Sequence, residues 1–245
     1  MMSNGQDTIN KLINSGQYKT LNEGLKNDAL VKLIIEKIND IDINRTKIIS
    51  FIGGPASGKT SIVDHLVKAL SSVAVISTDD YVVGTRQERR RLEQGDARSK
   101  YDIDLLNKKV KDICQLEDGV TVKVPTYDGK SGLAVAVGEE NYSKEIGRVD
   151  VLIVEGDFNF IEAQDLLIYL HVPDNIRLQN RIRRDTVERS QPDIKELTDN
   201  FNYRQLNQFW PYTLPVAERS DLLLTVTAKE RGNWFEYFYT VYLRK

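Results

Sequence analysis

Residues 47–61 read KIISFIGGPASGKTS and carry the strongest structural signal in the chain. Its first six residues form a short apolar run rich in isoleucine, which predicts a buried strand. The pattern Gly53-x-x-x-x-Gly58-Lys59-Thr60 follows at once, and residues 59–70 have the periodicity of a helix. A glycine-rich loop between a buried strand and a helix is a P-loop, whose backbone amides and helix N-terminus attract phosphate groups. The stretch therefore predicts a nucleoside triphosphate site in an α/β fold.

The loop pattern assigns a role to each of its residues. We expect ATP to be held by a continuous run of nine residues: Gly53, Gly54, Pro55, Ala56, Ser57, Gly58, Lys59, Thr60 and Ser61. Lys59 would reach the β- and γ-phosphates and act in catalysis, and Thr60 would offer its hydroxyl to Mg²⁺. ATP and Mg²⁺ are thus the expected cofactors. The alternative is a glycine-rich turn that binds no ligand.

Apolar runs alternate with helical patterns along the rest of the chain. Strands are predicted at 73–77, 120–124, 133–137, 149–155, 166–172, 221–226 and 234–242, and helices at 102–116, 174–190 and 192–209. This alternation predicts a doubly wound, mainly parallel sheet with helices on both faces, although it does not give the strand order. Residues 7–40 also have a helical pattern, so we expect an N-terminal helical extension (1–45) before a P-loop domain (46–245). The extension would pack on that domain or serve as a partner-binding arm.

Length and charge narrow the class of protein. The 245 residues suffice for one large α/β domain with a small appendage. Lys plus Arg number 34 and Asp plus Glu 36, a balance that gives no basic surface for nucleic acid. No stretch approaches the roughly 18 apolar residues of a membrane span, and the N-terminus lacks the apolar core of a signal peptide. We therefore expect a cytoplasmic protein that binds neither nucleic acid nor membrane; whether it forms a homo-oligomer stays open.

Acidic residues follow two of the predicted strands. Asp79 and Asp80 come after the strand at 73–77, and Glu155 ends the strand at 149–155. The carboxyl ends of strands meet at the ligand in a doubly wound sheet, so Asp79 and Asp80 would face the γ-phosphate, where a carboxylate is needed to accept the proton of an incoming hydroxyl. Glu155 has the position of a Walker B acid and would hold Mg²⁺ through water. The alternatives are loop acids that cap the next segment and an acid that simply ends a strand.

Five arginines lie within the thirteen residues from 177 to 189. One interpretation is a solvated helix with intrahelical ion pairs such as Arg181–Asp185. The other is a lid over the transferring phosphate, because Arg177, Arg181 and Arg184 fall on one helical face. Spacing alone does not decide between them.

Together these motifs resemble the uridine kinase and phosphoribulokinase family of P-loop small-molecule kinases, from about residue 46 to about residue 226. The similar segments are Gly53–Thr60, Ser77-x-Asp79-x-Tyr81, Asp96 with Tyr101-Asp102, PTYD (125–128), VLIVEG (151–156), RLQNRIRRDTVERS (177–190) and SDLLL (220–224). The resemblance implies that Asp79 is the base facing the acceptor hydroxyl. It also implies that Arg181 and Arg184 clamp the transferring group, and that Asp96, Tyr127 and Arg177 belong to the substrate site.

The chain departs from that family in the segment after PTYD. Uridine kinases carry there a base-contacting histidine and then an arginine, whereas GKSGLAVAVG (129–138) has neither, and Asn180 replaces an arginine of the lid. We therefore expect an ATP-dependent kinase that phosphorylates a hydroxyl of a nucleoside, sugar or similar small molecule, without committing to uridine. The alternative is a nucleotide-binding regulatory NTPase module with no small-molecule acceptor.

Overall fold

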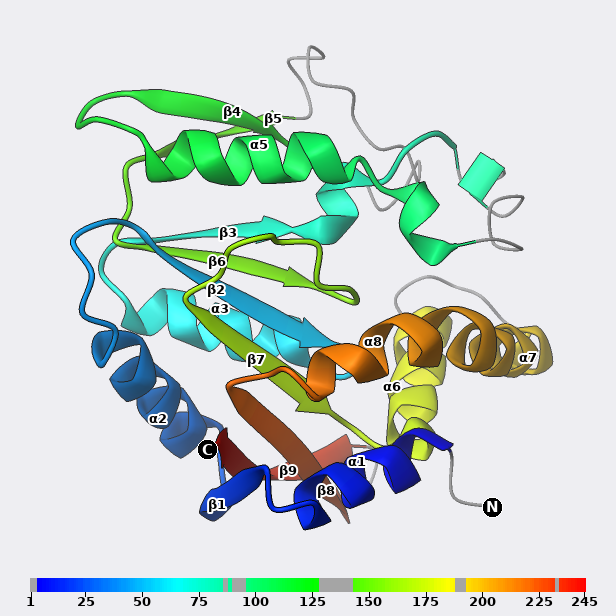
Figure 1. The fold of residues 1–245 in the computed structure, drawn as a ribbon. Helices are drawn as coiled ribbons and strands as arrows, with labels where there is room; N and C mark the ends of the chain where they lie inside the picture. The colour runs from blue at the N-terminus through cyan, green and yellow to red at the C-terminus, as the bar shows by residue number, and fades with distance from the viewer. Residues whose placement is uncertain (1–3, 86–87, 90–95, 128–142, 188–192, 232–233) are drawn as a thin grey trace.

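The computed structural model describes residues 4–85, 88–89, 96–127, 143–187, 193–231 and 234–245 (Figure 1). Its centre is a seven-stranded sheet with the order β1-β9-β8-β7-β2-β6-β3. The bounds of the strands are β1 Tyr18–Leu25, β2 Lys47–Gly53, β3 Val73–Ser77, β6 Val151–Gly156, β7 Leu166–His171, β8 Leu222–Arg231 and β9 Trp234–Arg244. The neighbours from β3 to β8 pair in parallel, while β9 is antiparallel to both β8 and β1. The mainly parallel sheet predicted from the alternating pattern is confirmed.

Helices cover both faces of this sheet, which explains why its central strands are apolar on both sides. One face packs against α2 (Asn27–Asn39) and α3 (Lys59–Ala69), in a core that includes Ile34, Phe51 and Leu66. The other face packs against α5 (Ile103–Cys114), α1 (Asn4–Asn14) and α8 (Trp210–Ala217). Every residue of β6 and β7 is buried as a result. In the described ranges, no helix combines the length and apolar character that crossing a bilayer requires.

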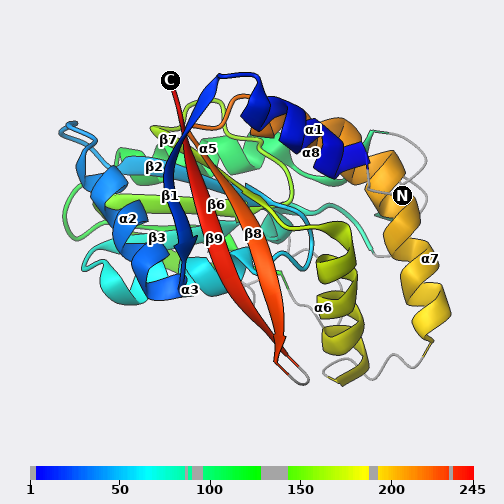
Figure 2. The same ribbon diagram turned by 90° about the horizontal axis from the view of Figure 1, so that it is seen from below.

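The N-terminal extension contains the expected helices, α1 and α2, but the prediction of a continuous helical pattern over 7–40 is wrong between them. Tyr18–Leu25 is instead the strand β1, paired with β9 at the edge of the main sheet (Figure 2). Its mostly polar sequence gives no strand signal, and the partner that stabilises it lies more than 200 residues away. The extension therefore contributes one strand, β1, to the main sheet.

Tyr18 anchors this edge strand to the body of the protein. Its buried hydroxyl lies 2.7 Å from the carbonyl oxygens of both Ala217 and Ser220. Tyr18→Phe removes that hydroxyl and leaves the two carbonyl oxygens without this hydrogen-bond donor. We therefore expect the free energy of unfolding to fall by about 1 kcal/mol. Chemical denaturation of the variant measures the change. Tyr203→Phe, at a half-exposed tyrosine on a helix, is the control that should change little, and equal stability of the two variants would contradict the anchor.

Two further segments differ in part from the sequence predictions, and a third is not described. The strand expected at 120–124 is β4 (Thr121–Pro125), which pairs with β5 (Ser143–Gly147) in a separate two-stranded antiparallel sheet. The strand expected at 133–137 lies outside the described residues. The helix expected at 192–209 is α7 (Ile194–Arg204), followed by the π-helical turn η4 (Gln205–Phe209) and then by α8, which was not predicted. Pro211 and Pro215 argue locally against a helix there, but Pro211 lies in its first turn, where no intrahelical N–H donor is needed.

Candidate active site

The P-loop connects the end of β2 to the start of α3, as the sequence predicts. Gly58 has a φ of 85°, and Ala56 has a φ of 60°, a left-handed conformation that is uncommon for alanine. The amide of Ser57 donates to the carbonyl oxygen of Gly54 at 3.2 Å and closes a turn inside the loop. The loop thus has a defined shape, with helix α3 beginning at Lys59 behind it.

Lys59, Thr60 and two acidic residues meet because β2 and β6 are neighbours in register, with Phe51 beside Glu155. The Lys59 Nζ lies 2.7 Å from Oδ1 of Asp157 and 3.4 Å from the carbonyl oxygen of Gly54. The Thr60 hydroxyl donates to Oε1 of Glu155 at 3.4 Å. The two residues predicted as metal ligands therefore lie together at the start of α3.

The chemistry of this pair fits Mg²⁺. Glu155 is buried, and its Oε2 has no hydrogen-bond partner in the described part of the chain. Burial raises the pKa of Glu155, against the lowering effects of Lys59 and of the Thr60 hydroxyl. An unpartnered carboxylate oxygen beside a hydroxyl offers the hard oxygen ligands that Mg²⁺ prefers, with water and phosphate completing its shell. Within the described ranges, no cluster of three or more His, Cys, Asp or Glu could hold a metal by protein ligands alone.

The short helix η1 (Thr78–Tyr81) gives its two aspartates different surroundings. Oδ1 of Asp80 accepts the backbone N–H of Tyr127 at 2.9 Å, and Oδ2 accepts that of Ser77 at 3.4 Å. Lys144 lies 3.7 Å from the same carboxylate. Asp80 therefore caps its own turn and fixes Tyr127, which is the capping alternative raised from the sequence.

Asp79 is the aspartate that remains available to a ligand. Its side chain is exposed, and no side-chain hydrogen bond or ion pair is found for it within the described ranges. The surrounding protein, although solvent still reaches the carboxylate, raises the pKa of Asp79 to about 6, with a further contribution from the negative charge of Asp157. Lys59 acts in the opposite direction. Asp79 thus shares an electrostatic environment with the phosphate-binding lysine.

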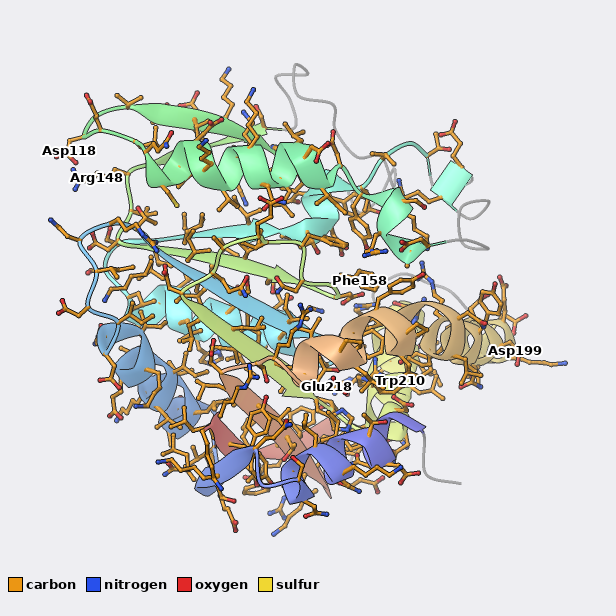
Figure 3. All side chains as sticks on the ribbon, in the orientation of Figure 1. Asp118, Arg148, Phe158, Asp199, Trp210 and Glu218 are labelled. Carbon is orange, nitrogen blue, oxygen red and sulfur yellow. The ribbon has the colours of Figure 1, made fainter. Side chains whose placement is uncertain are left out.

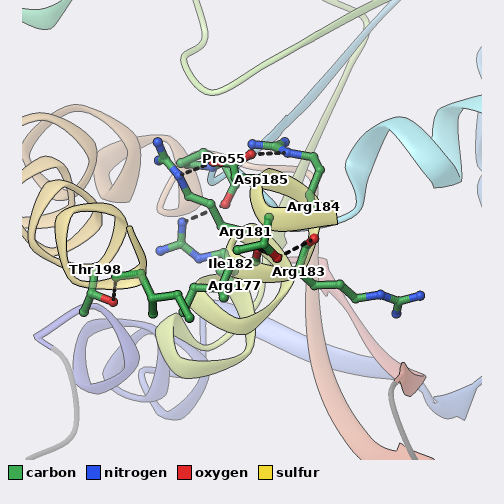
Figure 4. Close-up of polar contacts among 10 residues, drawn as sticks. Pro55, Arg177, Arg181, Ile182, Arg183, Arg184, Asp185 and Thr198 are labelled. Carbon is green, nitrogen blue, oxygen red and sulfur yellow. Dashed lines mark hydrogen bonds and ion pairs between the residues drawn. The ribbon is translucent and has the colours of Figure 1, made fainter. Parts of the chain in front are cut away.

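The three arginines predicted to share a face of α6 (Asp174–Val187), namely Arg177, Arg181 and Arg184, do not all have the same environment (Figure 4). Arg177 is 1% exposed and donates to the carbonyl oxygens of Val172 and Pro55, so in this structure it lies beneath the loop, away from solvent. Arg181 and Arg184 donate to the two oxygens of Asp185 at 3.3 and 3.0 Å. The expected Arg181–Asp185 pair is present.

Arg181 and Arg184 nevertheless carry more positive charge than one carboxylate neutralises. Burial lowers the pKa of Arg181, and the positive charge of Arg204 on α7 lowers it further. A cluster of cations on the helix whose Arg177 contacts the P-loop suits the binding of a polyanion. The helical-pair and lid interpretations of this segment are therefore compatible.

The other two predicted substrate residues are Tyr127 and Asp96. Tyr127 is held by Asp80, and the guanidinium of Arg89 lies 5.9 Å from its ring centre. Asp96 caps the short helix η2 (Ala97–Lys100) and accepts from the backbone N–H of Arg98 at 2.9 Å and its Nε at 2.8 Å. The hydrogen bond from the Arg98 side chain lowers the pKa of Asp96. The structure thus connects Tyr127 to the Asp79–Asp80 turn, while Asp96 contacts Arg98 and the side chain of Tyr212.

Sequence reasoning did not assign two residues that contact the loop. Asp157 pairs with Lys59, and the side-chain amide of Asn180 donates to the carbonyl oxygen of Ala56 at 3.1 Å. Asp157 lies two positions after Glu155, the Walker B acid, where its reach to the P-loop lysine could have been anticipated. Asn180 was visible only as a departure from the lid pattern, which gives no contact partner.

Comparisons of sequence and fold identify known proteins that are similar to this chain. A family model described as Phosphoribulokinase / Uridine kinase family matches residues 48–231. A uridine kinase of Staphylococcus epidermidis is 33% identical over 196 residues, which cover 74% of this chain and 88% of that protein. Uridine-cytidine kinase B of Dictyostelium discoideum is 28% identical over 187 residues, which cover 72% and 73%. The crystal structure of a putative fructose transport system kinase from Silicibacter sp. TM1040 has a similar fold, with a TM-score of 0.57 at 19% identity over 80% of this chain and 96% of that one.

Proposed function

The chain belongs to the phosphoribulokinase and uridine kinase family, and from that premise we propose that it uses Mg²⁺ to transfer the γ-phosphate of ATP to a hydroxyl of a nucleoside, sugar or similar metabolite. It is an ATP-dependent phosphotransferase with an alcohol group as acceptor. The observation that supports the finer proposal is the meeting of Lys59, Thr60 and Glu155 at the loop with the exposed carboxylate of Asp79 in their electrostatic field.

Each of these residues has a defined task in the proposed reaction. The loop amides and Lys59 hold the phosphates, and Lys59 exchanges its pairing with Asp157 for the incoming negative charge. Thr60 and Glu155 would hold Mg²⁺, which when bound neutralises phosphate charge. Arg181 and Arg184 supply further positive charge where negative charge develops on the transferring group. Most of the rate enhancement then comes from positioning and electrostatic stabilisation.

Asp79 is suited to receive the proton of the acceptor hydroxyl. With a pKa raised to about 6, its carboxylate is largely ionised near neutral pH and more basic than an ordinary aspartate. As the oxygen of the acceptor bonds to the γ-phosphorus and ADP departs, the hydroxyl proton passes to Asp79. Asp80 is occupied by backbone N–H groups and positions the turn.

Acceptor dependence tests the proposal against the regulatory-module alternative. ADP formation is measured with and without a pool of hydroxyl-bearing metabolites, and the phosphorylated product is identified by mass spectrometry. A kinase should release ADP at an appreciable rate only when its acceptor is present. Equal ADP release with and without the pool, with no phosphorylated product, would instead support a regulatory NTPase.

Uridine and cytidine are expected to be poor acceptors for this chain. The segment 129–138, which lacks the histidine and arginine found in uridine kinases, lies outside the described residues, so the prediction rests on its sequence. A site without base-contacting groups loses the selectivity that hydrogen bonds to a base provide, and we expect kcat/KM for uridine to fall at least about 100-fold below that for the best acceptor. Steady-state kinetics with both substrates measure the ratio. Equal values would show that other residues read the base.

A further inference from the structure

Helix α6 places two side chains on consecutive carbonyl groups of the P-loop. Arg177 Nη1 donates to the oxygen of Pro55 at 3.3 Å, and Asn180 Nδ2 donates to the oxygen of Ala56 at 3.1 Å. The two residues are three positions apart, so they share a helical face. In a planar trans peptide the C=O of one residue and the N–H of the next point in opposite directions. Holding these carbonyls against α6 therefore turns the following amides away from it.

The backbone conformation of Ala56 shows that the loop needs such support. An alanine with a φ of 60° is in a region that L-residues with a Cβ avoid, and it stays there only when its surroundings hold it. The bond from Asn180 is made to this residue, and the amide on the other side of the same peptide, that of Ser57, donates to Gly54. Both ends of the 56–57 peptide are thus fixed before any nucleotide binds.

Asn180 is itself held from strand β9. The hydroxyl of Tyr237 donates to its Oδ1 at 2.9 Å, which leaves the amide nitrogen directed at Ala56. A carbonyl can only accept, so the contact with Ala56 sets the orientation of the Asn180 amide unambiguously. Tyr237 lies beyond residue 231, where the family match ends.

Arg177 packs against two aromatic residues, one of which contacts the N-terminal helix α1. Its guanidinium lies 4.7 Å from the ring centre of Phe209 and 5.5 Å from that of Trp210, which Figure 3 labels at the start of α8. Helix α1 lies against α8 and approaches Trp210 so closely that a Cβ on Gly5 would fall 2.2 Å from the indole Cη2. A Cβ on Gly54 would fall 2.1 Å from Nη1 of Arg177. A continuous series of contacts therefore runs from α1 through Trp210 and Arg177 to the P-loop.

We propose that α1 and β9, which both lie outside the family match, form a brace that holds the P-loop in its nucleotide-binding shape by way of Arg177 and Asn180. Both are positioning residues, which act on the nucleotide through the loop backbone. The inference rests on the proposed function only in taking ATP as the ligand of the loop. It assigns to the N-terminal helix and the C-terminal strand a role in nucleotide affinity that the matched region does not contain.

Tyr237→Phe in the full chain tests the brace, because it removes one hydroxyl at the far end of the Asn180 contact. Loss of one hydrogen bond that preorganises the loop should raise the Kd for Mg·ATP about three- to tenfold by calorimetry. At saturating ATP, kcat should stay within about twofold, since Tyr237 does not touch the reacting groups. Tyr242→Phe on the same strand is the matched control and should leave the Kd unchanged. An unaltered Kd for Tyr237→Phe would overturn the proposal.

Hydrogen exchange in the nucleotide-free protein separates this inference from the proposed function. The Ser57 amide, which closes the turn in the loop, should exchange several-fold faster in Tyr237→Phe than in the wild type or in Tyr242→Phe. Gly5→Ala, which displaces Trp210 at the other end, should have the same effect on this amide. If the wild type bound no ATP, the proposed function would fail, while faster exchange would still support the brace. Unchanged exchange in both variants would refute the brace whatever the nucleotide.

Discussion

Replacing Lys59 with alanine is expected to lower kcat/KM by about 10²–10³-fold while the protein stays folded. The expected size is that of losing one preorganised charge contact to the transition state, about 2.7–4 kcal/mol. The ammonium group contacts Asp157 and the carbonyl oxygen of Gly54, both at the loop, and makes no contribution to the apolar cores. Loss of activity should therefore come without loss of the fold, as circular dichroism and denaturation would show.

The carboxylates around Lys59 make the expected effect larger at low pH. Its positive charge lowers the pKa of both Asp79 and Glu155, while the surrounding protein and, to a smaller extent, neighbouring acids raise these pKa values. Without the lysine these pKa values rise further, so a larger fraction of Asp79 would be protonated near neutral pH and unable to accept a proton. Above about pH 6, where the activity of the wild type levels off, the residual activity of Lys59→Ala should consequently continue to increase with pH.

Lys68 provides the matched control for this experiment. It is an exposed lysine at the other end of α3, and Lys68→Ala should leave activity unchanged. A folded Lys59→Ala variant with activity close to that of Lys68→Ala would contradict the phosphate-binding role of the loop.

The sequence was sufficient to predict the centre of the fold because its signals are local. The buried strands β6 and β7 are continuous apolar runs, and the P-loop pattern joins a strand to a helix within fifteen residues. The strand β1 could not be predicted in this way. Tyr18–Leu25 alternates poorly, and its strand conformation depends on pairing with β9 at the opposite end of the chain. Tertiary pairing outweighed local propensity there.

The same distinction applies to the candidate site. Spacing groups Arg177 with Arg181 and Arg184, but it does not reveal that Phe209 and Trp210, more than thirty residues later, enclose Arg177 and remove it from solvent. Spacing also left Asp80 open as a second candidate for the acceptor base. The N–H of Tyr127, 47 residues away, occupies that carboxylate, and only the folded chain brings them together.

Asp79→Asn should reduce phosphoryl transfer by about 10²–10⁴-fold, the usual contribution of a positioned acid or base, and should leave ATP affinity unchanged. The asparagine has nearly the same shape but cannot take a proton. The loop, Lys59 and the Thr60–Glu155 pair are untouched, so nucleotide binding measured by calorimetry should persist. If ATP affinity fell instead, Asp79 would belong to the metal site and its assignment as base would be wrong.

The pH profile gives this assignment a second, independent test. Since the pKa of Asp79 is raised to about 6 and the base must be ionised, kcat/KM of the wild type should increase with pH through about 6 and level off above it. The Asp79→Asn variant should lack this rise. Asp80→Asn should keep the rise and lose less activity, because its amide oxygen can still accept the N–H of Tyr127. A larger loss for Asp80→Asn, together with disappearance of the rise, would identify Asp80 as the base and move the active position by one residue.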